Sequence, residues 1–264
     1  FNEYIIFMFF FISFYLRIVL GFLKVEFLKC IEQSEVNRYP EADPSPLKDT
    51  LRSLMGIPDE FGILLGNGSD ELIQLLALAC SKDDLIMSFE PSFVMYELVS
   101  KYVNLEYFGV QLDSNFDINL SDALLIIERE KPKIIFIAYP NNPTGNCFDY
   151  DAIIEIIKST NSMVILDEAY YAYSDKSFLS EISNFPNLLV LRTISKIGFA
   201  GLRLGLLIGD QETIAHLNKL RLPYNINALT QTSANFLLQD KQRIINNAQI
   251  IIEERRRLAH ELSL

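Results

Sequence analysis

The sequence predicts an α/β fold with a mostly parallel sheet, and three observations predict it. Short apolar runs of strand length alternate with longer segments of helical periodicity. One run, residues 134–138, is apolar throughout, as is typical of a strand that helices cover on both faces. Loops rich in glycine and polar residues follow the strands, and ligands bind at that edge of such sheets.

The expected elements alternate between strand and helix, as in other α/β proteins. A turn-rich segment with three prolines, Pro40, Pro44 and Pro46, precedes a helix that we expect to begin near Leu47. The remaining predictions are, in order, a strand, turn and helix over residues 61–80, the same over residues 83–102, a strand at 134–138, a helix, turn and strand over 151–173, strands at 188–191 and 204–210, and one long helix over 227–264.

We expect three regions along the chain: an atypical apolar segment at residues 1–36, a large domain at 37–225 and a long helix at 226–264 that leads toward a small domain. Residues 4–23 carry a single charge, Arg17, so this run is a membrane-span candidate. It lacks the basic start and the cleavage site of a signal peptide. A true anchor, a misassigned upstream segment and an apolar core segment remain alternatives. We favour the misassigned segment, because the rest of the chain has the pattern of a soluble domain.

Charge and composition argue against several classes of function. The 34 acidic residues outnumber the 23 lysines and arginines and give a net charge of −11. An acidic chain repels the backbone of nucleic acids, so we expect no nucleic-acid partner. The three cysteines are scattered without a CxxC pair, which indicates a reducing compartment rather than a disulfide framework. The two histidines are not paired with carboxylates at helical spacing, so no metal site is predicted.

Two residues at predicted strand ends suggest a shared site. Asp167 ends a β-branched strand, where a buried carboxylate needs a partner. A helix N-cap or a structural ion pair is the plainer explanation of Asp167 taken alone. Lys196 follows the next predicted strand, and a lysine in a closed pocket has a lowered pKa that suits a Schiff-base amine. An amine and an acid on neighbouring strands are the pair that pyridoxal phosphate requires, one for its aldehyde and one for its ring nitrogen.

A phosphate would need a cradle, and one glycine-rich turn could form it. The segment GNGSDE at residues 66–71 opens a predicted helix, where backbone N–H groups and the helix dipole attract anions. Glu71 occupies the place of the last glycine in GxGxxG, so a dinucleotide fingerprint is disfavoured. Ser195 and Arg203, on either side of Lys196, add a hydroxyl and a fixed cation.

Three segments, in chain order, resemble those of the fold-type I pyridoxal-phosphate aminotransferases: YPNNPTG at 139–145, LDEAYYAY at 166–173 and TISKIGFAGLRLG at 193–205. With NRYPEADPSPL and GNGSDELIQLL upstream, the sequence is most similar to the histidinol-phosphate aminotransferases within that family. The resemblance covers residues 24–264. It implies a three-layer α/β/α sandwich with a mostly parallel sheet, in which residues 37–225 bind pyridoxal 5′-phosphate, and an incomplete small C-terminal domain.

The resemblance assigns roles to the residues around the cofactor ring. Lys196 matches the lysine that bonds to the cofactor and moves the substrate proton, and Asp167 matches the acid that keeps the ring nitrogen protonated. Tyr170 and Asn142 match the two partners of the ring's phenolic oxygen. Phe93 stands where the family places an aromatic ring that stacks on the cofactor, usually a tyrosine. Phe93 without the resemblance is equally explained as a core aromatic.

The resemblance also implies a set of phosphate contacts and a dimer. Ser69 and Asp70 match contacts made through backbone N–H groups, and Ser195 and Arg203 match side-chain contacts. Tyr39 matches a tyrosine that reaches the phosphate of the neighbouring subunit's cofactor, which implies a homodimer. Taken alone, Tyr39 is also explained as a turn aromatic.

The reaction that the resemblance implies is transamination between L-histidinol phosphate and 2-oxoglutarate in the cytoplasm. An aromatic-amino-acid aminotransferase and a threonine-phosphate decarboxylase share these cofactor motifs and stay open as alternatives, as does a non-catalytic remnant.

The chain also departs from the family in three places. Its segment from Lys196 to Arg203 is one residue shorter than in many relatives. The family's Asn-Glu-Asn-Pro segment and the small domain that carries the substrate-binding arginine have no counterpart, so we expect a sequence truncated at both ends.

Overall fold

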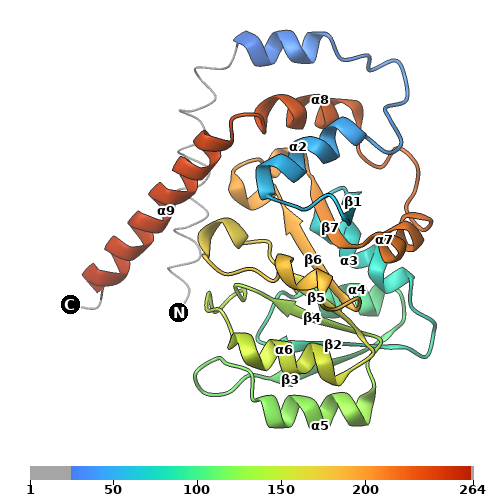
Figure 1. Cartoon of the computed structure of the whole chain (residues 1–264), viewed down its shortest axis with the longest axis vertical. Coiled ribbons are helices and arrows are strands. Elements are labelled where there is room, and N and C mark those ends of the chain that lie inside the picture. Colours follow the sequence, from blue (N-terminus) through green and yellow to red (C-terminus); the bar gives the residue numbers. More distant parts are fainter. Residues whose placement is uncertain (1–24, 263–264) are drawn as a thin grey trace. The chain divides into compact units, whose positions relative to one another are not determined.

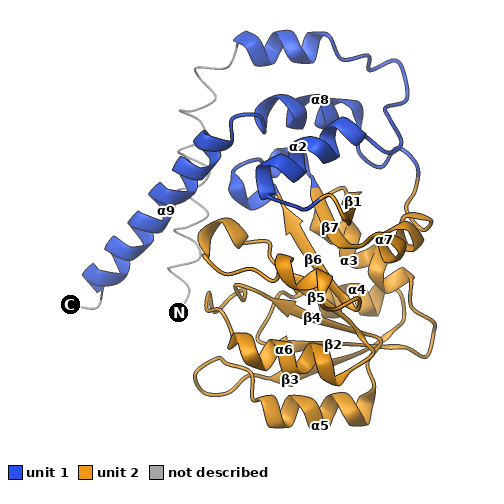
Figure 2. Ribbon diagram, in the orientation of Figure 1, with its two compact units in different colours: residues 1–58, 194–204, 223–264 blue, residues 59–193, 205–222 orange. Residues whose placement is uncertain are grey.

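The computed structural model describes residues 25–262 of the 264 in the chain, so the apolar run at 4–23 lies outside the described residues. Among residues 25–262, no helix is both long and apolar enough to cross a membrane. The chain divides into two compact units (Figure 2). Unit 2 holds residues 59–193 and 205–222, and unit 1 holds the other described residues. The expected division into regions at residues 36 and 225 stays a prediction.

The described part of unit 2 contains one sheet of seven strands in the order β1-β7-β6-β5-β4-β2-β3 (Figure 1). Neighbouring strands are parallel except at β7, which runs antiparallel to both β1 and β6. The predicted mostly parallel sheet is therefore confirmed. The strands are β1 (Phe61–Gly66), β2 (Leu85–Glu90), β3 (Glu106–Gln111), β4 (Ile134–Ala138), β5 (Met163–Asp167), β6 (Leu188–Thr193) and β7 (Gly205–Asp210).

Helices pack against the sheet because its apolar strands need cover. Residues of α3 (Ser69–Leu78), α4 (Met95–Tyr102) and α7 (Gln211–Asn218) share one hydrophobic cluster with the strands. We call the side of the sheet that faces this cluster the α4 face. The helices α5 (Leu120–Glu130) and α6 (Tyr150–Ser159) pack against each other (Figure 1).

Strand periodicity assigns the side chains near the strand ends to the two faces. In β5, Ile165 belongs to the cluster on the α4 face, so Asp167, two residues later, points to the same side. In β6, Leu189 and Leu191 belong to that cluster, so Arg192 points to the opposite side. One acid and one cation at neighbouring strand ends therefore lie on different faces of the sheet.

Unit 1 is helical. The helix α2 (Ser45–Met55) begins after Pro44 and ends at Gly56, whose φ of 65° makes a left-handed cap. It packs on α8 (Ala228–Leu237), where the Thr50 hydroxyl lies 3.1 Å from the side-chain oxygen of Asn235. Residues 25–32 are also helical, and Phe27 contacts Phe236 at a ring-centroid distance of 5.9 Å.

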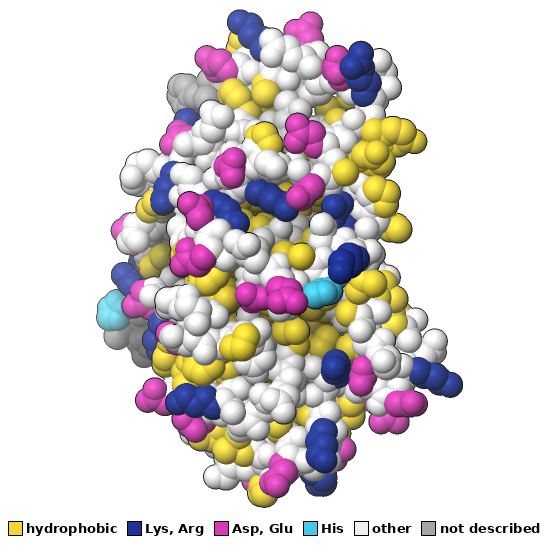
Figure 3. Space-filling model, turned by 45° about the vertical axis from the view of Figure 1, so that its right-hand side comes forward, with side chains coloured by type: hydrophobic (Ala, Val, Ile, Leu, Met, Phe, Trp, Pro, Cys, Tyr) yellow, Lys and Arg dark blue, Asp and Glu magenta, His cyan; other side chains and the backbone are white. Residues whose placement is uncertain are grey.

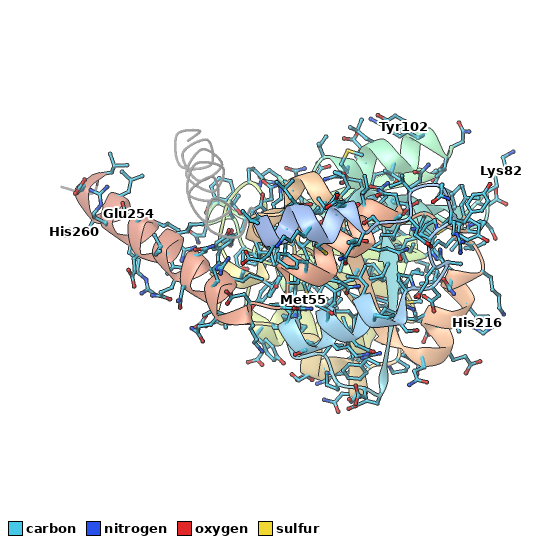
Figure 4. All side chains as sticks on the ribbon, turned by 90° about the horizontal axis from the view of Figure 1, so that it is seen from above. Met55, Lys82, Tyr102, His216, Glu254 and His260 are labelled. Carbon is cyan, nitrogen blue, oxygen red and sulfur yellow. The ribbon has the colours of Figure 1, made fainter. Side chains whose placement is uncertain are left out.

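The predicted single helix over 227–264 is wrong, because the chain forms two helices. After α8, a second helix, α9 (Lys241–Leu262), begins behind Asp240. The Asp240 side chain accepts a hydrogen bond from the backbone N–H of Arg243 at 3.0 Å, so it acts as an N-cap and starts a new helix. Within its described side chains, α9 buries Ile244 and Ala248, and Figure 4 labels two of its other residues, the half-buried Glu254 and the exposed His260.

Candidate functional site

The carboxyl ends of five strands lie at one edge of the sheet. In the register, Gly66 at the end of β1 pairs with Gly205, which pairs with Thr193 at the end of β6. Ala138 at the end of β4 pairs with Asp167 at the end of β5. The loop after β2 leaves the parallel strand next to β4. The loops that were expected to carry the site therefore leave the same edge of the sheet, where ligands bind in α/β folds.

Asp167 is buried, with 5% of its surface exposed, and neutral groups donate to it. The hydroxyl of Tyr96 donates to Oδ2 at 2.7 Å, and the backbone N–H of Ala169 donates to Oδ1 at 3.1 Å. Burial, and then the charge of Asp167, raise the pKa of Tyr96 well above its ordinary value, so this hydroxyl keeps its proton and stays a donor. The sequence analysis did not identify this contact of Tyr96.

Aromatic rings surround the Tyr96–Asp167 contact. Tyr96 stacks on Phe136 at a centroid distance of 4.6 Å, and Phe93 meets Tyr96 edge-on at 5.6 Å. Phe93 is half-buried. Tyr170 is also half-buried, and burial together with the charge of Asp167 raises its pKa to about 12. Tyr170 is therefore a hydrogen-bond donor at neutral pH.

The two asparagines of the YPNNPTG segment differ in burial and in hydrogen bonding. Asn141 is buried and joins two loops, because its amide donates to the carbonyl of Pro91 at 3.0 Å and to the Thr144 hydroxyl at 2.8 Å. Asn142 is half-buried, and within residues 25–262 its side chain makes no hydrogen bond. Sequence reasoning assigned only Asn142. The loop-holding role of Asn141 has no signal in the sequence beyond a second asparagine before Pro143.

The start of α3 has the properties of an anion site. Gly68 precedes it with a φ of 85°, and no side chain caps the helix there. A Cβ at Gly205 would lie 2.6 Å from the backbone N of Ser69, so β7 and the first turn of α3 are in close backbone contact. Ser69 and Asp70 form that first turn, as predicted. Backbone N–H groups at a helix start attract phosphate through the helix dipole.

A buried ion pair lies on the opposite face of the sheet. Arg192 donates from Nη2 to Oε2 of Glu168 at 2.8 Å and from Nε at 3.0 Å, and both residues are buried. The guanidinium also lies 4.5 Å from the ring centroid of Tyr171. Glu168 accepts from the backbone N–H of Phe178 at 2.6 Å as well. These contacts give Glu168 a structural role.

Four predicted site residues belong to unit 1. Ser195 and Lys196 lie in the short helix η3 (Ser195–Ile197), and Lys196 is half-buried. Arg203 lies in the left-handed region with a φ of 49° and donates from Nη1 to the Ser195 hydroxyl at 3.5 Å. The two predicted phosphate side chains therefore contact each other. Tyr39 is 82% exposed, and its ring stacks on that of Tyr224 at 4.7 Å.

The described part of the chain shows no group of three histidine, cysteine or acidic side chains that could hold a metal ion. Figure 4 labels the two histidines, His216 on α7 and His260 on α9. On the face drawn in Figure 3, acidic and basic side chains are interspersed, so charge of one sign does not gather there.

Comparisons with known proteins bear on this arrangement. The pattern of one family, aminotransferase class I and II, matches residues 23–264. A histidinol-phosphate aminotransferase of Vesicomyosocius okutanii is 57% identical over 230 residues, which are 87% of this chain and 65% of the relative. One from Neisseria meningitidis is 43% identical over 228 residues, 86% of this chain and 62% of the relative. The chain thus spans about 65% of the length of the first of these curated relatives.

Solved structures share the fold. A histidinol-phosphate aminotransferase from Clostridium acetobutylicum matches with a TM-score of 0.79 at 27% identity, covering 90% of this chain and 72% of that one. Another from Sinorhizobium meliloti, in complex with pyridoxal-5′-phosphate, matches with a TM-score of 0.78 at 21% identity, covering 88% and 65%. The three-layer α/β fold that the sequence predicted is confirmed.

Proposed function

Because the chain belongs to the class I and II aminotransferase family, we propose that it binds pyridoxal 5′-phosphate and that the whole protein transfers the amino group between L-histidinol phosphate and 2-oxoglutarate. The name of the relative that is 57% identical supports this substrate over an aromatic amino acid or threonine phosphate.

The observation that carries the proposal is the buried Asp167 at the carboxyl edge of the sheet. Its two oxygens accept hydrogen bonds from the Tyr96 hydroxyl and from the backbone N–H of Ala169, and such bonds stabilise the ionised carboxylate. Such an acid suits a cationic ring nitrogen. Lys196 follows Thr193, the last residue of β6, by three residues, and three residues span at most about 11 Å. The covalent chain therefore limits how far Lys196 can be from the strand next to Asp167.

The other predicted residues fit the remaining groups of the cofactor. The first turn of α3, without a capping side chain, suits the phosphate, and Ser195 and Arg203 would add a hydroxyl and a charge. Tyr170 keeps its proton because its pKa is about 12, so it would donate to the ring oxygen. The amide of Asn142, which has no hydrogen bond among residues 25–262, would donate to the same oxygen.

The chemistry divides between the cofactor and the chain. When bound, pyridoxal phosphate supplies an aldehyde that takes the amino group and a ring that accepts an electron pair. The Lys196 amine would take the proton from the Cα atom of the substrate and deliver it to the carbon of the cofactor's aldehyde group. Asp167 would hold a proton on the ring nitrogen, which keeps the ring electron-poor.

We further propose a homodimer in the cytoplasm. Tyr39 would reach the partner's cofactor phosphate, and its 82% exposure leaves its ring accessible. The three cysteines are free in the described residues, which fits a reducing compartment.

Cofactor binding tests the proposal first. Protein saturated with pyridoxal phosphate should be yellow, and Lys196→Ala should abolish the absorbance of the covalently bound cofactor. Asp167→Asn should keep part of the cofactor and lose most turnover, because a neutral ring nitrogen is a poor electron acceptor. Lys176→Ala, which removes an exposed lysine of unit 2, is the control and should behave like the wild type. A wild type that stays colourless, or a fully active Asp167→Asn, contradicts the assignment.

Half-reactions identify the substrate. The cofactor absorbance is followed after single additions of L-histidinol phosphate, glutamate, phenylalanine or threonine phosphate. Conversion with L-histidinol phosphate and with glutamate supports the proposed reaction. Conversion only with phenylalanine, or carbon dioxide release from threonine phosphate, supports one of the alternatives. Cofactor binding without any half-reaction supports a non-catalytic chain.

A further inference from the structure

The hydroxyl of Tyr96 lies inside the apolar cluster on the α4 face. Tyr96 is fully buried, and its ring packs between Phe136 and Phe93. A phenylalanine would fill this space equally well. Burying a hydroxyl costs free energy unless it is hydrogen-bonded, so its presence needs a partner, and that partner is Asp167 at 2.7 Å.

We propose that Tyr96 is a positioning residue, which acts through Asp167 to keep the proton on the ring nitrogen of the cofactor. This inference rests on the proposed function. A hydrogen bond donated to a carboxylate favours its ionised form. An ionised Asp167 leaves the shared proton on the ring nitrogen. Without the Tyr96 hydroxyl the proton shifts toward Asp167, and the ring becomes a weaker electron acceptor.

The geometry fixes the donor in place. The Tyr96 ring is parallel to Phe136 within 3° and nearly perpendicular to Phe93 at 84°, so neighbouring rings restrict it on two sides. Its backbone lies in α4, where the Ser100 hydroxyl donates to its carbonyl at 2.7 Å. The Ala169 N–H holds the other oxygen of Asp167, so both ends of the carboxylate are oriented. Donor and acceptor therefore meet without ordering a flexible side chain.

The test compares two buried tyrosines, one whose hydroxyl donates to Asp167 and one whose hydroxyl makes no hydrogen bond among the described residues. Tyr96→Phe removes the hydroxyl bonded to Asp167. Tyr139→Phe removes a hydroxyl that is equally buried but has no hydrogen-bond partner among the described residues. Each variant is saturated with pyridoxal phosphate labelled with nitrogen-15 in the ring, and the nitrogen resonance and the cofactor dissociation constant are measured.

We expect Tyr96→Phe to shift the ring-nitrogen resonance toward the deprotonated form and to weaken cofactor binding by about tenfold or more, as for a lost hydrogen bond to a charged group. Tyr139→Phe should leave both unchanged. A purely structural role for Tyr96 would change stability without moving the nitrogen resonance. An unshifted resonance in Tyr96→Phe would therefore overturn the inference.

A second comparison separates an effect of the Tyr96 hydroxyl on Asp167 from an effect on packing. In Asp167→Asn the side chain at 167 carries no charge, so removing the hydroxyl should change cofactor affinity by less than about twofold. An equally large effect of Tyr96→Phe in both backgrounds would also overturn the inference. If wild-type protein does not bind the cofactor at all, the proposed function fails and takes the inference with it, whereas a failure confined to the variants leaves the proposed function standing.

Discussion

At the scale of single residues, the side chains of the adjacent acids Asp167 and Glu168 lie on opposite faces of the sheet. Asp167 faces the α4 side and accepts from Tyr96, whereas Glu168 pairs with Arg192 on the other side. A strand places consecutive side chains on opposite faces, so the acid proposed for chemistry and the acid in the ion pair are separated by the backbone. The Glu168–Arg192 pair thus holds the end of β5 to β6 beside Asp167. Because this pair lies on the other face, Arg192 neutralises Glu168 rather than Asp167.

Breaking this pair should destabilise the protein strongly. We expect Arg192→Met to lower the free energy of unfolding by about 3–5 kcal/mol, because it leaves the buried Glu168 carboxylate without its cation. The double variant Glu168→Leu/Arg192→Met should recover much of the loss, since no buried charge remains. The free energy of unfolding of each variant is measured by urea unfolding.

The control for this prediction is a pair at the surface. Lys158→Met removes a cation that lies 3.1 Å from Glu155 and is half exposed, and it should change stability little. Equal losses for Lys158→Met and Arg192→Met would contradict the role of the buried pair.

At the scale of elements, one glycine sets the distance between β7 and α3. Gly205 lies in β7, and a Cβ there would come within 2.6 Å of backbone atoms of Gly68 and Ser69. Backbone atoms cannot move aside as a flexible side chain can. The close approach therefore fixes the first turn of α3, the turn proposed to bind phosphate.

Gly205→Ala should displace this turn. We expect a loss of about 1–3 kcal/mol in stability from overpacking, together with weaker binding of pyridoxal phosphate. Gly201→Ala is the control, because a Cβ there meets no atom within 4 Å. The cofactor dissociation constant of the two variants is compared by absorbance titration. Equal cofactor affinity in both variants would show that the start of α3 does not hold the cofactor.

The elements that sequence reasoning found are those with buried, regular patterns. The apolar run at 134–138 is buried at every position, and it was placed correctly. The strand β3 (Glu106–Gln111) was not predicted, because it pairs with β2 alone and buries only Val110. The break between α8 and α9 was also missed, since its signal is one short polar side chain, Asp240, within a continuing helical pattern.

The candidate site was predicted less completely than the fold. Residues in family motifs, such as Asp167 and Lys196, were assigned because their order along the chain is distinctive. Tyr96 and Asn141 were not assigned, because their partners lie 71 and 50 residues away in sequence. Only the folded sheet edge brings these partners together, and no local pattern encodes them.

At the scale of the whole molecule, the proposed cofactor residues come from both compact units. Asp167, Tyr170 and Asn142 belong to unit 2, and Ser195, Lys196 and Arg203 belong to unit 1 (Figure 2). The segment 194–204, which carries the last three, leaves the sheet after β6 and returns to it at β7. Its two ends are hydrogen-bonded, because the N–H of Ile194 donates to the carbonyl of Leu204 at 3.1 Å.

Binding of pyridoxal phosphate should protect the segments that carry its proposed contacts. We expect slower amide hydrogen exchange in residues 194–204 and in residues 67–72, because a ligand that binds only the folded state suppresses local opening where it makes contacts. At a free concentration of one hundred times the dissociation constant, the stabilisation would be about 2.7 kcal/mol. Pyridoxal without the phosphate should protect residues 67–72 less, since the helix start acts on the anion. Exchange is followed by mass spectrometry with and without each compound, and a lack of protection in either segment would contradict its proposed contact with the cofactor.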